Sequence, residues 1–136
     1  MIFCVEDDDN IRELVIYTLE TTGLEARGFA DGTAFMEALA FDTPELVLLD
    51  IMLPYRNGDT VLTAVRECST VPIIVISAKG TTQNKVDLLR LGADDYITKP
   101  FGMMELVSRV KAVLRRTQKT TKDTTCLLYT SPSPRD

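Results

Sequence analysis

Short, mostly apolar segments alternate along the chain with longer segments in which apolar residues recur every three or four positions. The short segments are residues 2–5, 24–29, 46–49, 72–76 and 95–98. Three of them, IFCV, LVLL and PIIVI, contain no charged residue, which is typical of strands buried on both faces of a sheet that helices cover. The segment 24–29 alternates only weakly, so we expect an outer strand there.

The first two helical segments carry end signals. Asp9 or Asn10 is placed to cap the first helix, and Gly23 is placed to end it. Asp31 can cap the second helix. We therefore expect these helices to begin near residues 10 and 32.

The three later helices follow the same pattern. The third carries Val61, Leu62 and Val65 on its inner side. The fourth begins at Thr81 or Thr82 and ends at Gly92, and its apolar residues are Val86, Leu89 and Leu91. The last has an apolar stripe between residues 106 and 114 and fades into residues 115–116.

Five alternations of strand and helix predict an α/β domain with a parallel sheet and helices on both faces. A chain of this length favours the small doubly wound sheet with strand order 2-1-3-4-5, whose site lies at the first and third strands. Right-handed crossovers place the carboxyl ends of all five strands on one edge.

Asp50 directly follows the apolar run 46–49. It therefore lies at the carboxyl end of a buried strand, where ligands bind in open α/β sheets. The alternative is that Asp50 only caps a turn, because aspartate is common there.

Other polar residues end strands on the same predicted edge. Glu6 and Asp7 follow the first strand, Ser77 ends the fourth, and Lys99 follows the fifth. Singly, these are ordinary loop, cap and surface residues. Together with Asp50 they form a cluster of acids that a cation would stabilise, and all-oxygen ligands suit Mg²⁺. A divalent cation, a lysine and a hydroxyl around one carboxylate predict phosphoryl transfer to that carboxylate.

Composition excludes several classes. The 136 residues contain no histidine, which rules out a Ser-His-Asp site and a usual zinc site. The net charge of -5 argues against nucleic-acid binding by this chain itself. No apolar run approaches a membrane span, and the first residues lack a signal-peptide pattern. Three scattered cysteines indicate reduced thiols and a cytoplasmic location.

These motifs resemble the receiver domain of bacterial two-component response regulators, in the OmpR/PhoB-like transcription-factor branch. The resemblance runs unbroken over residues 1–117 and implies the flavodoxin-like receiver fold. The residues that carry it are Val5-Glu6-Asp7-Asp8, Asp50-Ile51-Met52-Leu53-Pro54, Ser77-Ala78-Lys79 and Gly92-Ala93-Asp94-Asp95-Tyr96-Ile97-Thr98-Lys99-Pro100-Phe101.

The resemblance implies that Asp50 accepts a phosphoryl group from a phosphohistidine of a sensor histidine kinase. It implies that Asp7 and Asp50 ligate Mg²⁺ with the main-chain carbonyl of Met52, and that Glu6 helps through water. The domain would be a switch with at most slow self-dephosphorylation, rather than an enzyme.

Further roles follow from the same resemblance. Ser77 and Lys99 would bind the phosphoryl oxygens, and Tyr96 would be the aromatic switch that turns inward as Ser77 moves. The bond between Lys99 and Pro100 is expected to be cis.

The branch implies a homodimer through the fourth helix, the fifth strand and the fifth helix. By position, the pairs across that interface would be Lys85 with Glu105, Asp95 with Arg109, and Asp94 with Lys111. The alternative for each is a solvated surface charge, which contributes little.

The expected organisation is a receiver domain over 1–117, a polar linker over 118–125 and a non-native tail over 126–136. The tail looks like a translated sequencing adapter, and a genuine disordered tail is the alternative. In the branch it resembles, the linker leads to a winged-helix DNA-binding domain, which this chain lacks.

Two other function classes stay open. A metal-dependent phosphohydrolase with an aspartyl nucleophile often has a second acid two residues past it, where this chain has Met52. A stand-alone adaptor without DNA-binding output is the third reading.

Overall fold

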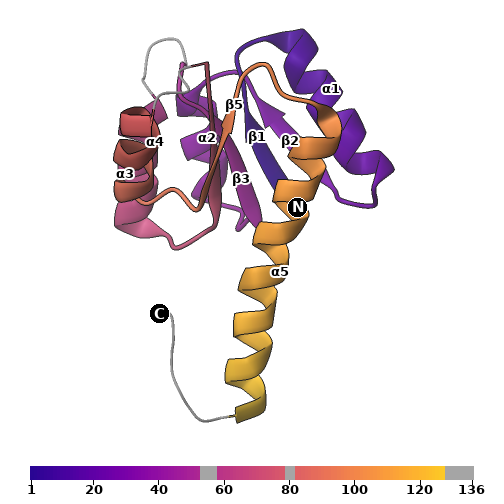
Figure 1. Ribbon diagram of the computed structural model, residues 1–136, viewed down its shortest axis with the longest axis vertical. Helices are drawn as coiled ribbons and strands as arrows, with labels where there is room; N and C mark the ends of the chain where they lie inside the picture. The colour runs from indigo at the N-terminus through magenta and orange to yellow at the C-terminus, as the bar shows by residue number, and fades with distance from the viewer. Residues whose placement is uncertain (53–57, 79–81, 128–136) are drawn as a thin grey trace.

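The computed structural model describes the backbone of residues 1–52, 58–78 and 82–127 and the side chains of residues 1–52, 60–78 and 85–116. In chain order the elements are β1 (Ile2–Val5), α1 (Asp9–Thr21), β2 (Ala26–Phe29), α2 (Gly32–Leu39), β3 (Leu46–Asp50), α3 (Gly58–Cys68), β4 (Ile73–Ser77), α4 (Thr82–Arg90), β5 (Asp95–Thr98) and α5 (Met103–Leu127). The strands form one parallel sheet in the order β2-β1-β3-β4-β5 (Figure 1). The predicted α/β fold and strand order are confirmed.

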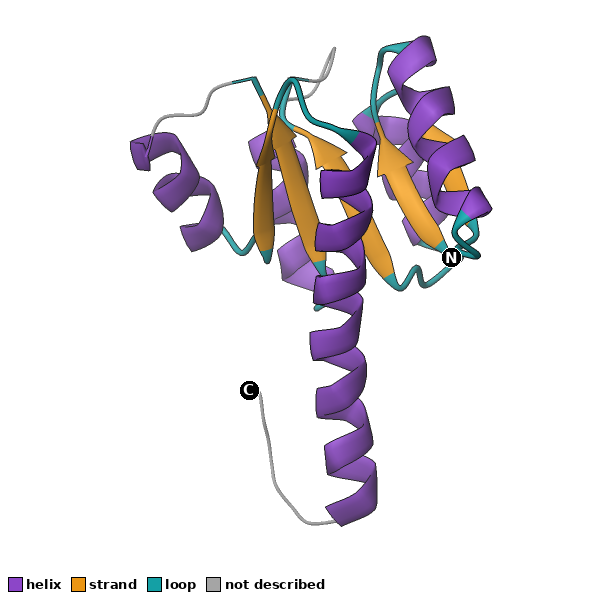
Figure 2. Cartoon of the chain, turned by 45° about the vertical axis from the view of Figure 1, so that its right-hand side comes forward, coloured by secondary structure: helices purple, strands orange, loops and turns teal. Residues whose placement is uncertain are grey.

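Helices cover both faces of the sheet, and alternate strand residues feed two cores (Figure 2). The first core joins one face of the sheet to α2, α3 and α4, and its strand residues include Phe3, Val5, Val47, Leu49, Ile73 and Val75. The second core joins the opposite face to α1 and α5, and its strand residues include Ile2, Cys4, Leu46, Leu48, Ile74 and Ile76. The continuous apolar runs in β1, β3 and β4 follow from this burial on both faces.

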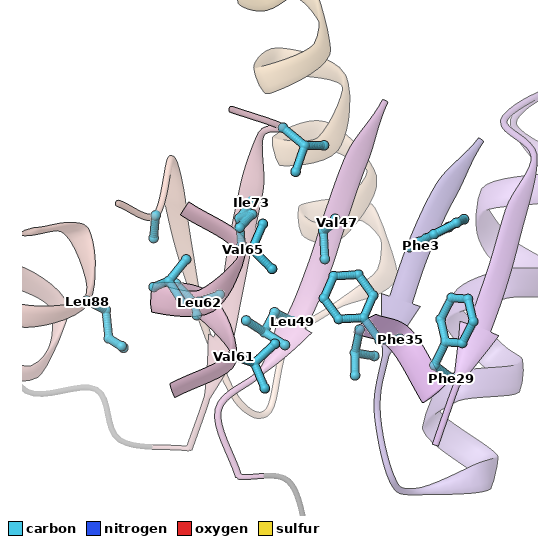
Figure 3. Close-up of a cluster of buried hydrophobic side chains, with 14 of the residues drawn as sticks. Phe3, Phe29, Phe35, Val47, Leu49, Val61, Leu62, Val65, Ile73 and Leu88 are labelled. Carbon is cyan, nitrogen blue, oxygen red and sulfur yellow. The ribbon is translucent and has the colours of Figure 1, made fainter. Parts of the chain in front are cut away.

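Three phenylalanines organise one end of the first core. Phe3, Phe29 and Phe35 meet edge to face, with ring centroids 4.9 to 6.3 Å apart (Figure 3). This geometry is favourable for aromatic pairs. The triad fixes β1, β2 and α2 against one another on the side of the sheet where β1 leads into Glu6.

The first helix begins at Asp9, and its N-cap lies one residue before the first of the predicted caps. Asp8 is its N-cap, and Asp8 Oδ1 accepts hydrogen bonds from the backbone N–H groups of Asn10 (2.9 Å) and Ile11 (3.1 Å). The prediction of Asp9 or Asn10 is therefore wrong by one or two positions, because four consecutive acidic or amide residues could all serve. Asp31 caps α2 as predicted.

The buried face of α4 also differs from the prediction. Leu88 is buried, whereas Leu89 and Leu91 are 44% and 40% exposed and Val86 is half-buried. Leu91 lies beyond the last helical residue, Arg90, so the spacing that included it was not a helical stripe.

The last helix runs to Leu127, beyond the predicted fading at residues 115–116. No glycine or proline interrupts residues 103–127, so nothing local stops the helix. Its C-terminal part projects away from the sheet (Figure 1). Of the predicted tail, residues 128–136 lie outside the described residues, and the boundary at 117 stays a prediction.

Within the described ranges, no helix combines the length and apolar character that a membrane crossing needs.

Candidate functional site

Four strands bring the predicted site residues to one edge of the sheet. The strands end at similar heights along that edge, since Asp50 pairs with Ile76 and Ser77 pairs with Thr98. Glu6 comes directly after β1, and Lys99 comes directly after β5. The cluster predicted from strand ends is confirmed as a spatial neighbourhood.

Asp50 is nearly inaccessible, and both of its carboxylate oxygens are held. Oδ1 accepts a hydrogen bond from the backbone N–H of Met52 at 2.9 Å. Oδ2 accepts one from Lys99 Nζ at 2.9 Å. A carboxylate held in this way at a strand end keeps its orientation, which a nucleophile requires.

Glu6 is the second buried acid. Its Oε2 accepts a hydrogen bond from the backbone N–H of Asp8, and its Oε1 lies 3.2 Å from Lys99 Nζ. Oε1 is fully buried and makes no hydrogen bond within the part of the chain that is described. Burial, and then the neighbouring Asp50, raise the pKa of Glu6 to about 7.

Lys99 lies between these two carboxylates. Burial lowers its pKa, but the contacts with Asp50 and Glu6 outweigh burial, so the pKa lies above its ordinary value. The lysine is therefore a fixed positive charge beside Asp50. The bond between Lys99 and Pro100 is cis, as the resemblance implied.

The acids fit a divalent cation. Glu6, Asp7 and Asp50 each offer a carboxylate oxygen, and these oxygens lie within 4.8 Å of one another. Asp7 is exposed, which leaves one side of the cluster open to water. Glu6 Oε1, which makes no hydrogen bond among the described residues, and the all-oxygen donor set both suit hydrated Mg²⁺. The role of the Met52 carbonyl as a ligand stays a prediction.

Sequence reasoning missed Arg12. Its Nη1 donates to the backbone carbonyl of Glu6 at 2.7 Å, and its Nη2 contacts Asp9. Its side-chain stem lies against Gly28, where a Cβ would come within 2.8 Å of Arg12 Cδ. Arg12 thus ties α1 to the end of β1. A basic residue one turn into the helix after an acidic run was the signal available.

Ser77 and Tyr96 lie on neighbouring strands. Ser77 is fully buried at the end of β4, and its carbonyl accepts the backbone N–H of Lys99 at 2.8 Å. Tyr96 is buried in the first core, with Lys85 Nζ 5.6 Å from its ring centroid. Both side chains are therefore buried, and the roles of Ser77 as a phosphoryl ligand and of Tyr96 as the switch stay predictions.

The six predicted dimer residues lie on α4, β5, the turn before β5 and α5. Within one chain, Arg109 Nη1 donates to both carboxylate oxygens of Asp95 at 3.0 and 3.1 Å, and Arg109 Nε donates to Glu105 at 3.2 Å. Asp94 Oδ2 pairs with Arg66 Nη2 at 2.9 Å. Pairing of these residues between two chains stays a prediction. Lys85 and Lys111 are exposed.

Comparison with known protein families matches residues 2–111 to the response regulator receiver domain. The chain is 45% identical over 112 residues to the transcriptional regulatory protein CseB of Streptomyces coelicolor, which covers 82% of this chain and 48% of that protein. It is 44% identical over 120 residues to the transcriptional regulatory protein SrrA of Staphylococcus aureus, covering 88% and 50%. The chain thus spans about half the length of these curated relatives.

Solved structures give the same result. The receiver domain of the Francisella response regulator 1452 matches with a TM-score of 0.82 and 31% identity, covering 85% of this chain and 97% of that chain. The BeF3-activated N-terminal receiver domain of Klebsiella pneumoniae RstA matches with a TM-score of 0.79 and 32% identity, covering 84% and 97%.

Proposed function

The chain belongs to the response regulator receiver family, and from that premise we propose that Asp50 accepts a phosphoryl group from a phosphohistidine of a sensor histidine kinase. One observation carries this proposal. Asp50 is buried at a strand end with a fixed lysine on one oxygen and two further acids at the same edge.

The transfer forms one bond and breaks one. A carboxylate oxygen of Asp50 attacks phosphorus, the bond from phosphorus to the imidazole nitrogen breaks, and an acyl phosphate results. Lys99, whose Nζ lies 2.9 Å from Asp50 Oδ2, and the hydroxyl of Ser77, which follows Ile76, the residue paired with Asp50, then bind the phosphoryl oxygens. Asp7, Asp50 and the Met52 carbonyl would hold Mg²⁺, with Glu6 acting through water, and the ion would supply further positive charge beside the acceptor.

The proposed role is a switch rather than a turnover enzyme. The position two residues after Asp50, where many aspartyl phosphohydrolases have a second acid, is Met52, whose side chain is 57% exposed. Nothing at that position activates a water molecule, so the acyl phosphate persists long enough to act as a signal.

We assign the output of the switch to a homodimer through α4, β5 and α5. Phosphorylation biases Ser77 and Tyr96, and thereby α4, toward the dimer-competent state. The proposed interchain pairs are Lys85 with Glu105 and Asp95 with Arg109. Because Arg109 binds Asp95 and Glu105 within one chain, these groups would have to share or exchange their partners when the dimer forms. Asp94 has one oxygen already bound within the chain, so its pairing with Lys111 uses Oδ1.

The relatives are transcriptional regulatory proteins about twice as long as the aligned region. We therefore propose that output reaches DNA through a domain outside this chain and that the exchange takes place in the cytoplasm. Cys4 and Cys68 are free thiols, in keeping with a reducing compartment.

Intact-mass spectrometry after incubation with Mg²⁺ and acetyl phosphate tests the acceptor. We expect one phosphoryl group on the wild type and none on Asp50→Asn or after metal chelation. Asp42→Asn, at an exposed aspartate, is the matched control and should be labelled like the wild type. Full labelling of Asp50→Asn would place the acceptor elsewhere.

A further inference from the structure

Arg66, on α3, binds two segments at the sheet edge opposite the acceptor, the loop before β4 and the turn between α4 and β5. Its Nε donates to the carbonyl of Gly92 at 2.9 Å, and its Nη2 donates to Asp94 Oδ2 at 2.9 Å. Its Nη1 donates to the carbonyls of Val71 at 2.7 Å and Ser69 at 3.3 Å. One guanidinium therefore joins the end of α3, the loop before β4 and the turn between α4 and β5.

The residues around Arg66 are suited to this contact. Gly92 has a φ of 118°, which side chains rarely adopt, and a Cβ there would lie 2.8 Å from Arg66 Cγ. Asp94 Oδ2 also accepts the backbone N–H of Ile73 at 2.8 Å. In return, the N–H of Asp94 donates to the Ile73 carbonyl at 2.8 Å. The turn is thus fixed on two sides, by α3 and by the start of β4.

The described side chains of α4 contribute little to the two hydrophobic cores. Among its described side chains, from Lys85 to Arg90, Leu88 is the one that is buried, and it enters the first core (Figure 3). The C-terminal end of α4 is therefore positioned by Leu88 and by the turn that Arg66 binds.

We propose that Arg66 is a positioning residue for the dimer face, holding the α4–β5 turn so that Asp95 meets Arg109 at a fixed place on that face. The inference rests on the proposed function, because it concerns the proposed dimer. Asp95 directly follows Asp94 and forms an ion pair with Arg109 within the chain, so loss of the Arg66 contact would move Asp95 and Arg109, two residues of the proposed dimer face. We expect the acceptor to be unaffected, since Asp50 ends β3 at the opposite edge of the sheet from Arg66.

The test compares the full chain with Arg66→Met, which keeps an apolar stem and removes all five N–H donors. Arg27→Met is the matched control. Arg27 lies on β2, the edge strand far from Arg66, and forms an exposed ion pair with Asp42. Each protein is treated with beryllofluoride and Mg²⁺, and its dimer dissociation constant is measured by sedimentation equilibrium. Circular dichroism verifies folding, and acetyl phosphate labelling verifies the acceptor.

For Arg66→Met we expect a dissociation constant at least about fivefold weaker than wild type, the loss typical of truncating an important interface residue. Labelling of Asp50 should be unchanged, and Arg27→Met should match the wild type in both. Combining Arg66→Met with Asp94→Asn should weaken the dimer by less than the sum of the two single effects, because the two residues act through one contact.

If Arg66→Met folds and dimerises with the wild-type dissociation constant, the inference is overturned. This holds even if the variant unfolds at a lower urea concentration, because the role of Arg66 would then be purely structural. If Arg66→Met does not fold, Arg66→Lys replaces it, because lysine keeps the charge but lacks the planar set of donors. A weaker dimer then supports the inference, and a wild-type dissociation constant overturns it. If the wild type itself stays monomeric, the proposed dimer fails, and that failure is recognised in the unmutated chain.

Discussion

Replacing Lys99 with methionine removes the positive charge that two buried carboxylates share. Lys99 Nζ lies 2.9 Å from Asp50 Oδ2 and 3.2 Å from Glu6 Oε1, and both acids have 2% side-chain exposure. Removing one partner of a buried ion pair typically costs about 3–5 kcal/mol, because a charge remains buried without compensation. The side chain of Lys99 is 23% exposed, and Glu6 can take up a proton. We therefore expect the lower end, about 3 kcal/mol of unfolding free energy, in metal-free buffer.

Mg²⁺ should reverse part of this loss. A divalent cation among Glu6, Asp7 and Asp50 supplies the charge that Lys99→Met removes, and it no longer faces repulsion from the lysine. The deficit measured in Mg²⁺ should thus be smaller than the deficit in chelator. Labelling by acetyl phosphate should still fall by about 10²–10³, the usual effect of losing one group that stabilises a developing oxyanion.

Urea denaturation followed by circular dichroism, with and without Mg²⁺, measures the stability terms. Lys111→Met is the matched control, because Lys111 is exposed on α5, and its stability should stay within about 0.5 kcal/mol of wild type. A Lys99→Met protein as stable as this control in chelator would refute the reasoning. So would a deficit that Mg²⁺ leaves unchanged.

Three further predictions concern the fold around the site. Iodoacetamide should label exposed Cys68 in the folded protein and spare Cys4. Cys4 is buried, and burial and Glu6 raise its pKa to about 12. Peptide mapping that finds Cys4 labelled without urea would contradict this prediction. Leu88→Ala should lower the urea-derived unfolding free energy by about 2–5 kcal/mol, and a loss like that of an exposed leucine would mean that α4 does not depend on this contact. Asp31→Ala should lower the thermal unfolding midpoint, because it removes an N-cap hydrogen bond that contributes about 1 kcal/mol of stability. Asp31→Asn should retain most of that stability.

Most of the site could be predicted from the residues at the ends of the strands. Residues 46–50 and 72–77 are apolar up to a polar terminal residue, and both faces of these strands are indeed buried. Because parallel strands end on one edge, the positions of Asp50, Ser77 and Lys99 along the chain were enough to place them together. The pocket was thus predictable from local patterns and one topological rule.

Contacts that depend on side-chain packing were not predictable. Arg66 meets Gly92 and Asp94, which are 26 and 28 positions away, and no local pattern marks an arginine at the end of a helix as their partner. The inner residue of α4 was missed because a helix of nine residues shows only about two and a half turns of its stripe. Both depend on how the turn before β5 packs on α3.

Strand β5 connects the two regions that the proposals concern. It begins at Asp95, beside the turn that Arg66 holds, passes Tyr96 in the first core, and ends where Lys99 reaches Asp50. Its pairing with β4 is continuous from Ile74 to Ser77, so the sheet holds the strand along its whole length between the two regions. Variants at its two ends should nevertheless fail differently. Lys99→Met should lose phosphoryl acceptance, whereas Arg66→Met should keep acceptance and lose assembly. If both proteins lost both activities, the common cause would be a weakened sheet rather than two sites joined by one strand.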